Sequence, residues 1–146
     1  MAIVAQFVLL SQTQQLHSFA DIGSISEVRG NAQVLRDKPY GAELEFNIQQ
    51  MDDVRTEAGR VAITFEDSST VKLTEHSKLV IDKYIYDPDP SKSKMALKFA
   101  SGTARFITGK FNNKSNISIK TPTADIAIRG TDFTCTVDEL GRSLVI

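Results

Sequence analysis

Nucleophilic chemistry in this chain depends on Cys135, the only cysteine, and on two histidines, His17 and His76. A catalytic thiol needs a base beside it, so one of the two histidines would have to lie next to Cys135. Cys135 lies in the run Phe-Thr-Cys-Thr-Val, whose alternating pattern is typical of a strand. We therefore predict a small buried thiol without a catalytic role. A single cysteine also excludes a disulfide within the chain.

Two pairs of carboxylates are the other candidates for chemistry: Asp52 with Asp53, and Asp87 with Asp89. Calcium takes six or more oxygen ligands, and the chain has no EF-hand spacing to supply them. Glycoside hydrolysis needs two carboxyl groups that face each other across a cleft. Both pairs lie in turn-like segments, which favours ordinary turn aspartates. The sequence thus predicts no catalytic residue, no cofactor site and no metal site, and the protein is expected not to be an enzyme.

The charges are balanced, with 17 basic and 18 acidic side chains and a formal net charge of −1. A dedicated nucleic-acid binder normally carries a strong basic surplus, so we expect no nucleic-acid partner. The chain has no apolar tract long enough for a membrane-spanning helix. Five lysines gather near a proline-rich loop and are expected to be solvated, with contact to an anionic partner as the alternative: Lys92, Lys94, Lys98, Lys110 and Lys114.

Hydrophobic residues alternate with polar ones from Ile22 onward, which predicts about a dozen short strands and no amphipathic helix after residue 20. Val61–Leu73 reads as a hairpin, and Leu44–Ile48 as a short strand. Met95–Phe99 and Ala104–Ile107 read as two strands separated by a turn. The predicted fold class is all-β, with many short strands in a stacked, solenoid-like or sandwich domain and a short N-terminal helix or strand.

A weak internal repeat favours the stacked arrangement. Arg55-Thr56, Gly59 and Val61-Ala62-Ile63 match Lys120-Thr121, Ala124 and Ile126-Ala127-Ile128 at the same spacing. Chance similarity between two strand-turn-strand segments is the alternative interpretation.

The first twenty residues differ from the rest. A short apolar run, 2–10, is followed by a polar stretch that ends in Ser18-Phe19-Ala20, as in an export signal with a small-residue cleavage site. However, no Lys or Arg precedes the run, and Gln6 interrupts it. The segment is therefore either signal-like or a structural segment that packs on the domain. Residues 21–146 form the predicted β-domain.

A motif near the C-terminus carries a resemblance. Between Thr121 and Val137 the sequence reads TPTADIAIRGTDFTCTV, which resembles the signature of the FecR domain family. Gly23–Leu35, Met51–Thr56 and Val61–Leu73 resemble the upstream elements of that family, although Met51 and Ser68 stand where the family usually has glycine. The key positions of the motif are Thr121, Pro122, Arg129, Gly130, Thr131 and Phe133.

These motif residues have structural interpretations. Pro122 starts a strand and holds Thr121 extended, and Gly130 permits a sharp turn. Thr131 bonds to local backbone, and Phe133 enters the core. Arg129 either braces the turn against Asp125, Asp132 or a carbonyl, which we favour, or contacts a ligand.

The resemblance implies a non-catalytic interaction module in the periplasm or outside the cell, which acts by protein–protein contact or signal relay. The alternative is a structural subunit of a phage virion or a homopolymer. The chain stops in the apolar strand Leu144-Val145-Ile146, before the last strands that the family normally has, and these residues form a candidate interaction edge. A protein partner or self-association is expected, and the sequence identifies no small-molecule ligand.

Overall fold

The structure is a computed structural model that describes residues 19–111, 116–128 and 132–146. Its described part is all-β, as predicted, with thirteen strands and one short 3-10 helix, η1. The N-terminal helix or strand expected in residues 1–20 lies outside the described residues, except for Phe19 and Ala20. The elements are β1 Asp21–Arg29, β2 Ala32–Leu35, β3 Pro39–Gly41, β4 Asn47–Gln49, β5 Asp53–Thr56, β6 Arg60–Phe65, β7 Thr70–Leu73, β8 Lys78–Ile85, η1 Pro90–Lys92, β9 Lys94–Ile107, β10 Asn116–Lys120, β11 Asp125–Ile128, β12 Asp132–Val137 and β13 Ser143–Val145.

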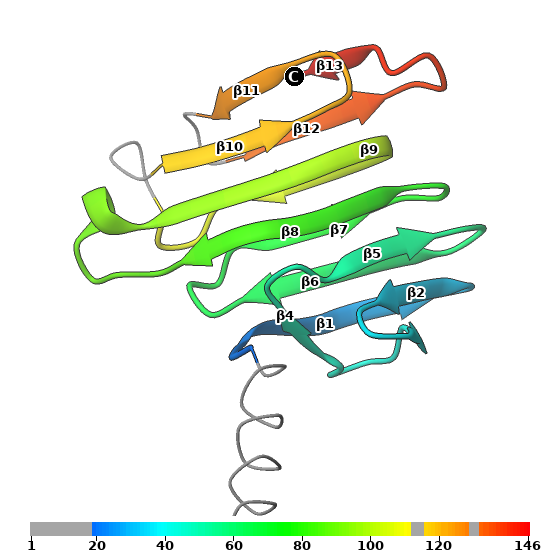
Figure 1. Cartoon of the computed structure of the whole chain (residues 1–146), viewed down its shortest axis with the longest axis horizontal. Helices are drawn as coiled ribbons and strands as arrows, with labels where there is room; N and C mark the ends of the chain where they lie inside the picture. The colour runs from blue at the N-terminus through cyan, green and yellow to red at the C-terminus, as the bar shows by residue number, and fades with distance from the viewer. Residues whose placement is uncertain (1–18, 112–115, 129–131) are drawn as a thin grey trace, which may run out of the picture.

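The long strand β9 joins all the strands into one curled sheet with two layers (Figure 1). Its first half pairs with β8 and β10, and its second half pairs with β7 and β12. Layer A has the strand order β4-β1-β6-β7-β9-β12-β13, and layer B has the order β3-β2-β5-β8-β9-β10-β11. All pairs are antiparallel except β9 with β10.

Four of the corners at which the chain passes between the layers are β1 to β2, β5 to β6, β7 to β8, and the bend within β9. Backbone hydrogen bonds connect the first three of these corners. Glu57 N donates to Asn31 O at 3.1 Å, and His76 N donates to Glu57 O at 2.8 Å. Gly102 forms the bend in β9 at a φ of 97°, where a Cβ would collide with Ser77. The fold is therefore stacked at its corners and sandwich-like between them.

Alternation along the strands sends one set of apolar side chains between the layers, as the period-two pattern predicts. Residues from both layers meet there: Phe65 of β6 stacks on Tyr84 of β8 with ring centroids 5.0 Å apart, and Tyr84 stacks on Phe111 at 5.7 Å. The largest fully buried side chains are Phe99, Phe111, Ile25, Ile48, Ile63, Leu73, Leu79, Ile81, Leu97, Ile119, Val34 and Val54.

Two local predictions differ from the structure. Leu44–Ile48 is not one strand: Leu44 is 61% exposed, Glu45 has a φ of 67°, and β4 begins only at Asn47. The two strands predicted in 95–107 are one strand, β9, because Gly102 lets it bend without breaking.

The internal repeat also differs in three dimensions. The turn after β5 carries the chain from layer B to layer A, whereas β10 and β11 form a hairpin within layer B. The two similar segments therefore do not form the same structural unit.

Candidate functional site

Thr121 and Pro122 lie in the turn between β10 and β11, and they contact the turn between β12 and β13. Thr121 is buried, and its Oγ1 accepts hydrogen bonds from Ala124 N at 3.1 Å and from Ser143 Oγ at 2.6 Å. Pro122 is exposed, and its ring lies beside Gly141, which has a φ of 81°. Thr121 thus acts as a buried hydrogen-bonding centre that connects the edge strands of the two layers.

Phe133 enters β12 and packs inward, with its side chain 8% exposed and its ring stacked on Phe106 at 4.9 Å. Arg129, Gly130 and Thr131 lie outside the described residues. Asp132, one of the partners considered for Arg129, is held by Arg105 of β9, whose Nε and Nη2 donate to the two carboxylate oxygens at 3.0 and 2.6 Å. No local sequence pattern marks this pair, because its members are 27 positions apart.

The aspartate pairs considered for catalysis or calcium have structural partners. Asp52 is fully buried, and Arg36 donates to both of its oxygens at 2.8 Å. This hydrogen bond raises the pKa of the Arg36 guanidinium above its ordinary value. Asp53 pairs with Arg55 at 2.9 Å.

The second pair is equally local. Asp87 and Asp89 accept backbone hydrogen bonds within their own loop, from Asp89 N at 2.9 Å and from Ser91 N at 3.0 Å. In the part of the chain that the structure describes, no three His, Cys, Asp or Glu residues lie close enough to hold a metal ion.

A second buried carboxylate, Asp67, was not singled out by the sequence because it reads as an ordinary turn residue. It follows β6, is fully buried, and accepts a hydrogen bond from Tyr84 Oη at 2.6 Å and another from Ser69 Oγ. Lys110 N also donates to Asp67, at 3.2 Å to its carboxylate. Asp67 therefore ties the β6–β7 turn to β8 and to the segment after β9.

The candidate nucleophile is placed as a core residue. Cys135 is fully buried in β12, and burial raises the pKa of its thiol. His76 lies exposed at the corner between β7 and β8 with a φ of 54°, and His17 lies outside the described residues. β12, which carries Cys135, pairs with neither β7 nor β8, the two strands that flank His76.

The candidate interaction edge is β13, which continues to the last residue through hydrogen bonds between Thr134 and Ile146 at 2.9 Å in both directions. Leu144 is 58% exposed and Ile146 is 81% exposed. Val145 lies opposite buried Cys135, so its side chain faces the space between the layers. Within the described residues, β13 pairs only with β12, and β11 pairs only with β10.

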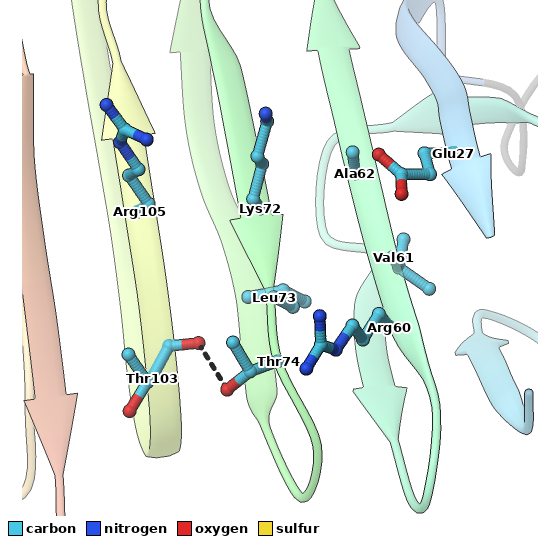
Figure 2. A pocket seen from close by; sticks show the side chains of 9 residues that line it. All are labelled: Glu27, Arg60, Val61, Ala62, Lys72, Leu73, Thr74, Thr103 and Arg105. Atoms are coloured by element: carbon cyan, nitrogen blue, oxygen red, sulfur yellow. Dashed lines mark hydrogen bonds between the residues drawn. The ribbon is translucent and has the colours of Figure 1, made fainter. Parts of the chain in front are cut away.

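A groove lies on the outer face of layer A, where β6, β7 and β9 run side by side (Figure 2). Side chains of Arg60, Lys72 and Arg105 rise from these strands, and Glu27 borders it from β1. Composition gave no signal for this feature, since the cations lie on three different strands.

The fold is that of an all-β domain. The polar clusters around Asp52, Asp67, Thr121 and Asp132 hold its strands and turns together. The FecR protein family model matches residues 52–146, and the chain belongs to this family. The family is regulatory, non-enzymatic and typically periplasmic, and membership in it suggests a signalling or regulatory domain. No curated protein and no solved structure is significantly similar to the chain.

The matched region begins at Asp52, so the resemblance seen at Gly23–Leu35 lies outside it. In the fold, β1 and β2 nevertheless extend layers A and B by pairing with β6 and β5. No helix in the described ranges has the length and apolar character needed to cross a bilayer.

Proposed function

We propose that this chain is a FecR-type interaction module that works outside the cytoplasm, with residues 21–146 as its domain. It relays a signal by binding a protein strand rather than by chemistry. The proposal is supported by the end of the sheet that is formed by β11 and β13, which we call the sheet end. There both layers present strands that, in the described part of the chain, are bonded on one side only.

The two ends of the sheet differ in ways that matter for binding. At the opposite end, β3 starts with Pro39, which has no N–H to donate. A proline in an edge strand discourages pairing with another chain. The sheet end instead exposes Leu144 and Ile146 beside unpaired backbone groups, which suits the addition of a partner's strand.

The inner side of the sheet end offers a second reason for a strand to bind. Val145 of β13 faces the interior but is 37% exposed, and Ile126 of β11 is only partly buried although it lies opposite fully buried Ile119. An added strand would cover these side chains, and burial of apolar area is favourable at roughly 25 cal/mol per Å².

The same features support a second candidate, a structural subunit of a phage virion or another homopolymer. In that case the strand added at the sheet end comes from a copy of the same chain, with the N-terminal segment as a further contact. The two candidates differ in the identity of the partner and not in the edge that is used.

Intact mass and light scattering on the protein from its native source test both candidates. A monomer lacking the first twenty residues supports the exported module and contradicts the homopolymer. A concentration-dependent assembly that retains them supports the structural subunit, and Leu144→Lys should then dissociate it. Leu140→Lys is the matched control, because Leu140 is 75% exposed but lies in the turn before β13.

A further inference from the structure

The groove on the outer face of layer A has the size and shape of a binding site for a few side chains. Its volume is about 310 Å³, at the lower end of the range for ligand sites. It is lined by Glu27, Arg60, Val61, Ala62, Lys72, Leu73, Thr74, Thr103 and Arg105. Apart from Thr74, which follows β7, these residues lie on four adjacent strands of one layer, so the groove is held by a rigid sheet.

The strand register explains why this face is hollowed. Ala62 lies opposite Glu27 on one side and Lys72 on the other. A methyl group between two long side chains leaves a gap above the sheet. Thr74 and Thr103 also have short side chains and extend the gap. Thr74 Oγ1 donates to Thr103 O at 3.2 Å (Figure 2).

The charges around the groove are unequal. Three cations face one carboxylate among the lining residues, and Arg105 is already occupied by Asp132. Glu27 lies 3.8 Å from Arg29, outside the groove. Within the described ranges, neither Arg60 nor Lys72 has a side-chain hydrogen bond or ion pair, although the charge of Lys72 helps to lower the pKa of Asp132. Two cations on neighbouring strands are therefore available to an anion.

An apolar margin continues the same face. In the cross-strand register, Arg105 of β9 lies beside Thr134 of β12, which lies beside Ile146. Thr103 of β9 likewise lies beside Thr136, which lies beside Leu144 of β13. A ligand that crosses the face perpendicular to the strands meets cations first, then threonine hydroxyls, then two exposed aliphatic side chains.

We infer that this groove binds an acidic peptide segment of a protein partner, with carboxylates on Lys72 and Arg60 and aliphatic side chains toward Leu144 and Ile146. The inference deepens the proposed function, on which it rests, by naming the chemistry of the partner. A densely charged polyphosphate fits less well, because Glu27 and Asp132 place two carboxylates on the same face. A peptide with spaced acids avoids both of them.

Fluorescence anisotropy tests the inference with a short labelled peptide in which glutamates are separated by leucine and serine. The same peptide with glutamine in place of glutamate is the ligand control. The peptide should bind the full chain at low ionic strength and release as salt rises, because exposed charges are screened. Lys72→Glu should weaken binding roughly three- to tenfold, since it removes one attraction and adds one repulsion.

The matched control is Lys83→Glu, the same charge change on β8 of layer B, where the side chain is exposed. Ala62→Leu fills the groove without changing charge and should also weaken binding, with circular dichroism to show that it folds. Equal binding by Lys72→Glu and Lys83→Glu overturns the inference. Equal binding of the glutamine peptide, or tighter binding of inorganic polyphosphate, overturns it as well.

The two proposals fail separately. Leu144→Lys, with Leu140→Lys as its control, reports on strand addition at the sheet end through assembly size, whereas Lys72→Glu reports on peptide affinity. A monomer that binds the peptide retains the groove assignment even if no strand adds at the edge.

Discussion

Ser68 occupies a position that the backbone makes unfavourable for any residue with a Cβ. Ser68 N bonds Phe65 O at 2.9 Å, and Phe65 N bonds Ser69 O at 2.8 Å, which closes a three-residue hairpin loop between β6 and β7. The third loop residue of such a hairpin takes the left-handed conformation, and Ser68 has a φ of 71°. We predict that Ser68→Gly stabilises the protein.

The magnitude is the balance of two opposing effects. A non-glycine residue in the left-handed region costs roughly 1–2 kcal/mol. Glycine makes the unfolded chain more flexible, which offsets about 0.5–1 kcal/mol of that gain. The net increase in the free energy of unfolding is therefore about 0.5–1 kcal/mol, or a rise in Tm of about 1–4 °C for a chain of this size.

Urea unfolding and differential scanning calorimetry measure the effect, with Ser68→Ala as the matched control. Alanine keeps the Cβ at positive φ and removes only an exposed hydroxyl, so its stability should stay within about 0.5 kcal/mol of the parent. If Ser68→Gly is no more stable than Ser68→Ala, the left-handed backbone is not the source of strain, and the reasoning is refuted.

Two further predictions concern the polar braces. Tyr84→Phe should lower the free energy of unfolding by about 1–3 kcal/mol, because it removes a donor from buried Asp67; Tyr40→Phe, whose hydroxyl bonds Asp37 at the surface, should change it little. Arg105 lowers the pKa of Asp132 through their hydrogen bond, so this stabilisation is present above about pH 4 and is lost as the pH falls through the lowered value. Urea midpoints at pH 7 and pH 3 should therefore differ less in Arg105→Gln than in the parent; an equal difference would contradict the role of the pair.

Much of the fold could be predicted because alternation is a local property. A strand with one face buried must place apolar residues at every second position, and Val61, Ile63 and Phe65 have this spacing and are all buried. The hairpin around Asp67–Ser69 was likewise predicted from turn composition. The family motif located Phe133, although Arg129, Gly130 and Thr131 lie outside the described residues.

The candidate sites were harder to predict because their members are distant in the chain. The Arg36–Asp52 pair spans 16 positions, and the groove combines side chains from β1, β6, β7 and β9. Neither set has a spacing that marks it, since antiparallel pairing brings together residues whose separation depends on the lengths of the intervening loops.

The sequence by itself determined that this protein is a strand-rich FecR-type domain with an inward apolar face, because hydrophobic period and turn chemistry act within a few residues. Only the tertiary structure decided that β9 bends at Gly102 to serve both layers, that Asp52 and Asp67 are buried braces, and that Arg60 and Lys72 face one groove. These outcomes depend on which strands pair and in what register, and that choice is made by packing between segments that no local pattern connects.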